Sequence, residues 1–240
     1  MRTGTLAVAG LTAALLAAAP AGAYEGGAVA NGGTISGTVA FEGDPPAPEE
    51  LNVTKDNAVC GEKKTSNALL VGPDKGIKNV VVRVTDIAKG KPMEQPASNP
   101  VFDQKGCEYH PHVLLFPAGS TIDILNSDGI LHNVHTTSTA NPAFNQAQPK
   151  FKKKIEKTIE KPEMPIKVVC DAHGWMLAWW ISQEHPYYAL TDEKGAFEMK
   201  DVPPGDYQVE LWHEVLGKHT EKVTVEPGGT MTLTVKMAKK

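Results

Sequence analysis

Three side chains in a seven-residue segment could bind a transition metal. Cys170 offers a thiolate, His173 an imidazole and Met176 a thioether, each three residues after the one before. Sulfur ligands are soft and select copper over magnesium, calcium or manganese. A trigonal copper site of two imidazoles and one thiolate, with a weak axial methionine, needs one further histidine. The segment therefore predicts a copper centre that another part of the chain completes.

His132 is the candidate for the missing imidazole. It lies in residues 130–137, which are predicted to form a strand that would hold the side chain in a fixed and buried position. Cys170 follows the β-branched run 166–169, which predicts a second strand. From the loop after this second strand, the histidine and the methionine would turn back to the same ion.

Other histidines have weaker claims to a metal. His135 lies three residues after His132, an odd offset that turns it to the opposite face of a strand, so we do not expect it to be a ligand. His110 and His112 would share one face of an extended segment. They form either a second metal site or ordinary structural or solvated positions, and the sequence leaves both open.

The pattern His132-Asn133-Val134 on one predicted strand, with Cys-x2-His-x2-Met after another, resembles the cupredoxins, the family of type 1 copper proteins. The short ligand loop is similar to that of the amicyanin group within this family. The resemblance implies that Asn133 ties the two ligand-bearing segments together by hydrogen bonds. It also implies one copper ion, cycling between Cu(I) and Cu(II), on four residues: His132, Cys170, His173 and Met176.

A glycine and three tryptophans in and after the ligand loop lead to further expectations. Gly174 stands where short-loop cupredoxins often have proline, so a softer loop is expected. Trp175 could lie over the metal or face a partner, and we expect it to face outward. Trp179 and Trp180 are neighbours on the next predicted strand, so one should lie in the core and the other on the opposite face.

Residues 185–240 have a different character, with hairpins closed by glycine-containing turns. The pattern Thr191-Asp192-x-x-Gly195-x-Phe197, followed by Val202-Pro203-Pro204-Gly205-x-Tyr207, resembles the carboxypeptidase regulatory-like β-sandwich, which is prealbumin-like. Residues 35–39 resemble the opening strand of the same family. The whole combination resembles exported plastocyanin-like proteins sometimes called methylamine-utilisation proteins.

The expected fold is all-β, with a cupredoxin Greek-key β-sandwich and a second, carboxypeptidase-regulatory-like β-sandwich. The N-terminal β segment could belong to that second sandwich, with the copper domain inside it or stacked on it. Residues 151–160 fit a helix or a strand, and we favour the strand because prolines flank them. The expected parts are a signal peptide at 1–23, an N-terminal β segment at 24–100, the cupredoxin domain at 101–184 and the second sandwich at 185–240.

The N-terminus has the pattern of a Sec-type signal peptide, with a positive start, an apolar run from Leu6 to Ala19 and small residues before Tyr24. The apolar run is too short to span a membrane, and no later stretch approaches that length. We therefore expect a periplasmic or secreted protein without a membrane span. In such a protein, Cys60 and Cys107 favour a disulfide, with two buried free thiols as the alternative.

Composition and motifs narrow the function. The formal net charge of −4 argues against a nucleic-acid partner. A lysine-rich stretch at 150–167 either forms a solvated edge or steers an acidic redox partner. The sequence contains neither a haem-binding Cys-x-x-Cys-His motif nor the Cys-x3-Cys pattern of a binuclear copper centre.

We therefore expect a one-electron carrier, not an enzyme, that exchanges electrons with a redox partner such as a c-type cytochrome or a dehydrogenase. One alternative is a periplasmic copper-binding or delivery protein. Another is a surface interaction module in which copper is incidental.

Overall fold

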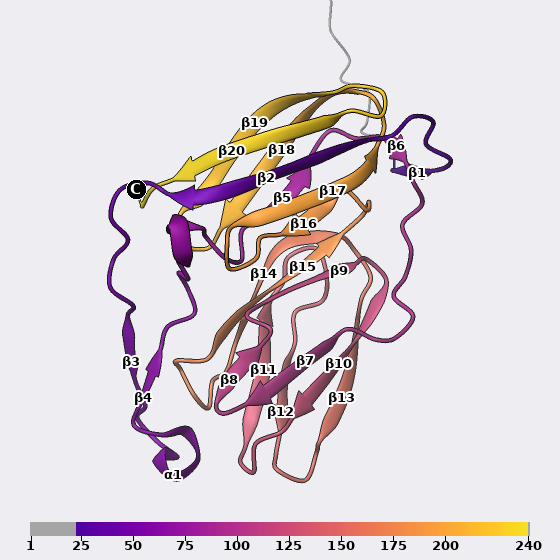
Figure 1. Cartoon of the computed structure of the whole chain (residues 1–240). Helices are drawn as coiled ribbons and strands as arrows, with labels where there is room; N and C mark the ends of the chain where they lie inside the picture. The colour runs from indigo at the N-terminus through magenta and orange to yellow at the C-terminus, as the bar shows by residue number, and fades with distance from the viewer. Residues whose placement is uncertain (1–22, 240) are drawn as a thin grey trace, which may run out of the picture.

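Strands make up nearly all of the regular structure in the computed structural model, which describes residues 23–239 (Figure 1). Within these residues, the helical elements are α1 (Asn57–Cys60) and a single 3-10 turn (Pro73–Lys75). The strands follow from alternation in the sequence. In β10 (Ser120–Asn126), buried and partly exposed residues alternate through all seven positions. The all-β prediction is confirmed.

The first sandwich consists of two sheets drawn from residues 101–183. One sheet has the order β13-β10-β7-β8 and the other β12-β11-β14-β15-β9. Besides β10, the first sheet contains β7 (Val101–Lys105), β8 (Glu108–His110) and β13 (Lys154–Ile159). The second contains β9 (Val113–Pro117), β11 (His132–Thr137), β12 (Asn145–Gln148), β14 (Glu163–Val169) and β15 (Leu177–Gln183). Because β13 is a strand, the strand interpretation of residues 151–160 is confirmed.

The second sandwich contains strands from both sides of the first sandwich in the sequence, β2 and β5 before it and β16 to β20 after it. One sheet, β16-β5-β18-β19, contains β5 (Val81–Val84), β16 (Tyr188–Leu190), β18 (Gly205–His213) and β19 (Gly217–Val225). The other, β17-β2-β20, contains β2 (Gly33–Phe41), β17 (Ala196–Val202) and β20 (Thr230–Met237). Strands β2 and β20 run parallel from Thr34–Thr230 to Phe41–Met237. Figure 1 shows these indigo and yellow strands side by side. A short parallel pair, β1 (Glu25–Gly26) with β6 (Lys89–Gly90), lies outside both sandwiches.

The two sandwiches pack against each other through a small apolar cluster. The rings of Trp179 and Trp212, one from each sandwich, lie 5.3 Å apart between centroids. Beside them, His112 of the first sandwich contacts Glu214 of the second, and both side chains are nearly buried. Trp180 points the other way and is fully buried in the core of the first sandwich. The expectation that the two adjacent tryptophans occupy opposite faces is therefore confirmed.

Residues 49–66 form a separate flap, which we call the cover. Its strands β3 (Glu50–Asn52) and β4 (Lys63–Thr65) pair only with each other, and α1 lies between them. A disulfide joins Cys60 of the cover to Cys107 in the turn between β7 and β8. This confirms the expected disulfide. In Figure 1 the cover extends alongside the first sandwich, with α1 at its far end.

Glu163, the first residue of β14, fastens the neighbouring loop. Its carboxylate accepts hydrogen bonds from side chains and backbone N–H groups of Ser138, Thr139 and Asn141. Burial alone would raise the pKa of this carboxyl, but the hydrogen bonds bring the pKa from the usual 4.5 down to about 2. The ionised form is therefore favoured in the folded state.

Acid should release this fastening. The pKa of the Glu163 carboxyl is lower in the folded than in the unfolded protein. Its contribution to the free energy of unfolding is therefore fully present above about pH 4.5 and is lost as the pH falls toward 2. We expect Glu163→Gln to lower the free energy of unfolding at pH 7 by about 1–2 kcal/mol, a figure reduced for partial exposure. Urea unfolding at pH 7 and pH 3 measures this change in the free energy of unfolding. The control is Glu160→Gln, which alters an exposed carboxylate nearby. An equal loss for Glu163→Gln at both pH values would contradict the prediction.

Within residues 23–239, no helix is long and apolar enough to cross a membrane. The expected signal peptide covers residues 1–23, of which residues 1–22 lie outside the described part of the chain. It stays a prediction.

Candidate metal centre

The pairing of β11 with β14 brings His132 and Cys170 together. Strand β11 begins at His132, and β14 ends at Val169, one residue before Cys170. The antiparallel register sets His135 opposite Val169, so the chain beyond β14 runs toward the start of β11. The Asn133 backbone N–H then donates to the Cys170 Sγ at 3.5 Å. Two strands of one sheet therefore hold the first two predicted ligands.

A tight loop returns the other two predicted ligands to the same region. The Met176 N–H donates to the His173 carbonyl at 2.9 Å, and the Cys170 N–H donates to the Met176 carbonyl at 3.4 Å. These two hydrogen bonds close the loop between β14 and β15. Met176 is 2% exposed and belongs to the same buried cluster as Cys170. All four predicted ligands are therefore buried in one region of the first sandwich.

Three donor atoms converge on one point. The His132 Nδ1 lies 3.0 Å from the His173 Nδ1, which lies 3.8 Å from the Cys170 Sγ. One ligand atom from each of the three residues lies within 4.8 Å of the others. None of the three side chains is more than 1% exposed. A single ion about 2 Å from each nitrogen can bridge such separations.

Two carboxylates fix which nitrogen of each imidazole carries the proton. The His132 Nε2 lies 2.9 Å from the Asp128 Oδ2, and the His173 Nε2 lies 2.9 Å from the Asp56 Oδ2. An ionised carboxylate only accepts hydrogen bonds, so each Nε2 is the donor, and a ring that carries a single proton then keeps its lone pair on Nδ1. Two lone pairs 3.0 Å apart cannot hydrogen-bond to each other, but they can share a cation. With the sulfur of Cys170, these nitrogens fit the copper that the donor types predict.

The protonation states around the site follow from burial and hydrogen bonding. Burial lowers the pKa of His132 below its usual value, although the hydrogen bond to Asp128 opposes this. Burial would raise the pKa of Asp128, but the N–H groups of Cys107 and Gly106 and the His132 ring bring it below its usual value. Burial also raises the pKa of the Cys170 thiol. A neutral imidazole backed by an ionised carboxylate is the state that a metal ligand needs.

Asn133 connects the two segments that carry the ligands. Its Oδ1 accepts hydrogen bonds from the Cys170 thiol at 3.3 Å and from the Ala172 N–H at 3.1 Å. Its Nδ2 donates to Asn145 on the neighbouring strand β12 at 2.8 Å. The start of β11 is thereby fastened to the beginning of the ligand loop, as the resemblance implies.

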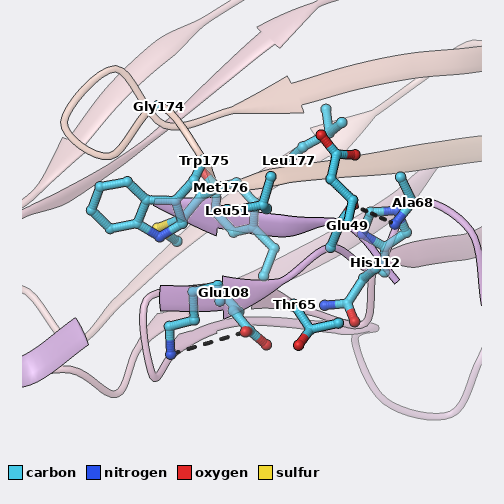
Figure 2. A pocket seen from close by; sticks show the side chains of 14 residues that line it. Glu49, Leu51, Thr65, Ala68, Glu108, His112, Gly174, Trp175, Met176 and Leu177 are labelled. Atoms are coloured by element: carbon cyan, nitrogen blue, oxygen red, sulfur yellow. Dashed lines mark hydrogen bonds and ion pairs between the residues drawn. The ribbon is translucent and has the colours of Figure 1, made fainter. Parts of the chain in front are cut away.

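Trp175 does not face outward, contrary to the prediction. Its ring lies edge-on to His173 with 5.0 Å between centroids, and its Nε1 donates to the Cys107 carbonyl at 3.1 Å. Figure 2 shows the indole beside Met176 in the wall of a cavity. The prediction was wrong because the indole packs against His173 and is held by its hydrogen bond to the disulfide-linked turn at Cys107.

The two carboxylates behind the imidazoles were not predicted. Asp128 lies four residues before His132, and this Asp-x3-His spacing was a signal that could have been used. Asp56 is 117 residues away from His173 in the chain, and no local pattern indicates their contact. Only the position of the cover brings them together.

The remaining histidines lie apart from this centre. His135 pairs with Asp171 at 3.0 Å on the exposed face, which confirms that it is not directed at the other ligands. His110 contacts the Lys105 carbonyl, whereas His112 contacts Glu214, so the two do not converge. Within residues 23–239, a second metal-capable group combines Cys107, Asp128 and His132. The sulfur of Cys107 is held in the disulfide, so this group lacks a free thiolate.

Comparisons with known proteins cover parts of the chain. A protein-family model described as polysaccharide lyase family 4, domain II matches residues 165–233, less than half of the chain, from β14 into β20. No curated protein sequence matches the chain.

Several solved structures are similar to part of it. The copper-containing nitrite reductase of Thermus scotoductus is 21% identical, with a TM-score of 0.34 over 40% of this chain and 24% of that one. Amicyanin from Paracoccus versutus is 21% identical, with a TM-score of 0.33 over 37% of this chain and 84% of that one. A purple cupredoxin from Nitrosopumilus maritimus is 18% identical, with a TM-score of 0.31 over 35% of this chain and 100% of that one.

These matches each cover 40% of the chain or less, so the chemistry has to follow from the site itself. The site is a buried, rigid set of two imidazole nitrogens and one cysteine sulfur, with a methionine in the same core and a carboxylate behind each imidazole. Such a set can hold one soft or borderline metal ion in a fixed geometry.

Proposed function

We propose that this protein carries single electrons on one copper ion held by His132, Cys170, His173 and Met176. The observation that carries the proposal is that the Nδ1 atoms of two buried histidines and the Cys170 sulfur lie together at one buried point. Bound copper would supply a Cu(II)/Cu(I) couple, which such a donor set tunes. Hydrogen bonds from the start of β11, within the closed loop and to the Asn133 side chain restrain the segments that carry the donor atoms.

We propose electron carriage rather than catalysis, since the two imidazoles and the thiol are at most 1% exposed and leave a substrate no direct approach to the donor atoms. The proposed partner is a redox protein such as a c-type cytochrome or a dehydrogenase. The proposed location is periplasmic or extracellular. The disulfide supports this location, because such bonds persist in oxidising compartments.

The visible and paramagnetic spectra of the copper-loaded, oxidised protein test the proposal. A thiolate bound to Cu(II) gives intense charge-transfer colour, so one equivalent of copper should turn the protein deeply coloured, and reversible voltammetry should follow. The parallel control is the same protein loaded with zinc, which has no such transition. A pale protein that nevertheless binds one copper would contradict electron carriage and favour a copper-delivery protein.

A further inference from the structure

The cover reaches the metal centre at one hydrogen bond. Asp56, in the turn that precedes α1, lies 2.9 Å from the Nε2 of His173, and the His173 side chain is 0% exposed. The Nε2 atom is on the side of the ring away from the donor atom Nδ1. The Asp56 side chain is itself 44% exposed, so this hydrogen bond lies between the buried imidazole and the solvent. The cover therefore closes the site from outside.

The polar contacts of the cover are otherwise almost all internal. Its strands pair with each other, the Val53 N–H donates to the Glu62 carbonyl, and the Ser66 N–H donates to the Glu49 carbonyl. Beyond the Asp56 contact, the covalent and polar links to the first sandwich within residues 23–239 are the disulfide and a 4.0 Å ion pair between Lys64 and Glu108. Val53 is the buried apolar residue of the cover that, with Cys60, joins the core cluster of the first sandwich. The cover is therefore a small unit fastened at few points.

The disulfide also connects the cover to the second imidazole, that of His132. The backbone N–H of Cys107, the disulfide partner of Cys60, donates to the Asp128 Oδ2, and the same oxygen lies 2.9 Å from the Nε2 of His132. Within the cover, the Cys60 N–H donates to the Asp56 carbonyl. A continuous path thus runs from one imidazole through Asp128, the disulfide and Asp56 to the other imidazole.

The other end of the cover is loosely packed. A cavity of about 250 Å³ separates it from the ligand loop. Glu49, Leu51 and Thr65 of the cover line this cavity together with Trp175 and Met176 of the ligand loop (Figure 2). Since the strand end of the cover leaves a gap, its hold on the centre is concentrated at the α1 end, at Asp56 and the disulfide.

The geometry points to Asp56 as a positioning residue of the metal centre, carried on a disulfide-anchored cover that shields His173. This inference rests on the proposed copper site for its effect on the metal, but the shielding itself does not need the metal. Asp56 accepts the Nε2 proton, which keeps the Nδ1 lone pair directed at the other donors. Its charge also makes the imidazole a stronger donor, which stabilises Cu(II) over Cu(I) and lowers the reduction potential.

Thiol labelling of the metal-free protein tests the shielding. Cys170 is the one cysteine outside the disulfide among the three in the sequence, so iodoacetamide without reductant reports its exposure alone. We expect Asp56→Ala to be labelled roughly three to ten times faster than the unaltered protein, because a charged hydrogen bond that holds a local unit closed is lost. Asp56→Asn, whose amide oxygen can still accept the Nε2 proton, should be labelled at nearly the original rate.

The matched control is Glu62→Gln, which removes a carboxylate from the same cover. Glu62 is exposed, and its side chain makes no hydrogen bond or ion pair within residues 23–239. Near-ultraviolet circular dichroism shows that each variant is folded. Equal labelling rates for Asp56→Ala, Glu62→Gln and the unaltered protein would overturn the shielding, whether or not the protein binds copper.

The copper-loaded protein tests the positioning. Asp56→Asn should raise the reduction potential and shift the visible absorption, because the charge behind His173 is removed while the hydrogen bond is retained. Glu62→Gln should change neither. An unchanged potential in Asp56→Asn would overturn the positioning role. A protein that shows no copper–thiolate spectrum in any variant would instead overturn the proposed function and leave the labelling result standing.

Discussion

Replacement of Cys170 by serine is expected to abolish the copper–thiolate colour completely. Serine occupies nearly the same volume, so the buried position and the hydrogen bonds around Asn133 are kept while the sulfur is lost. A hydroxyl is a hard ligand and is poorly suited to copper in this site. We expect copper affinity to fall by more than about 100-fold, since removal of an outer hydrogen-bond partner alone costs about 10–100-fold.

The absorption spectrum and a competition titration with a chelator measure this loss. His135→Ala is the matched control, because His135 lies on the same strand as His132 but pairs with Asp171 on the exposed face. It should keep the colour and the affinity. A Cys170→Ser protein that remains deeply coloured would mean that the sulfur of Cys170 is not the copper ligand.

The closeness of the four proposed ligands could be predicted because three of them lie near one another in the sequence. Cys170, His173 and Met176 lie in one short loop, and His132 begins a strand that the sequence predicts over residues 130–137. Strand pairing does the rest, since residues at the ends of adjacent antiparallel strands must lie close together. Their placement as metal ligands stays a prediction until metal is bound.

The surroundings of the site were not predictable in the same way. The cover has no strong periodicity, its strands are three residues each, and its contact with His173 joins residues 117 positions apart. No rule about local spacing indicates such a contact. The error about Trp175 has the same origin, because the Cys107 carbonyl that accepts its hydrogen bond belongs to a turn 68 residues away in the sequence.

The strands were easier to predict than their order. Alternation identifies β10, β18 and β20 from the sequence, but it does not say which strands become neighbours. The parallel pairing of β2 with β20 joins segments almost 200 residues apart. It is decided by the packing of both apolar faces into one core, which includes Ile35 and Val235.

Replacement of Trp180 by alanine should cause the largest loss of stability in the first sandwich. The side chain is 0% exposed. Its ring makes edge-to-face contacts with Phe102 and Phe116 at centroid distances of 5.1 and 6.3 Å, and it lies 6.1 Å from Phe144. Truncation removes these contacts and leaves a cavity that rigid strands cannot fill. We expect the free energy of unfolding to fall by about 3–5 kcal/mol, measured by urea denaturation of the metal-free protein.

Trp180→Phe separates packing from polarity. The Trp180 Nε1 has no hydrogen-bond partner among the described residues, and a buried N–H without a partner costs about 1–3 kcal/mol. Phenylalanine removes that penalty while keeping most of the ring, so its net loss should stay below about 1.5 kcal/mol. A Trp180→Ala loss no larger than that of Trp180→Phe would contradict the proposed role of the ring. Because β15 follows directly after Met176, loosening this core should also speed the release of bound copper, which links the packing of Trp180 to the geometry of the centre.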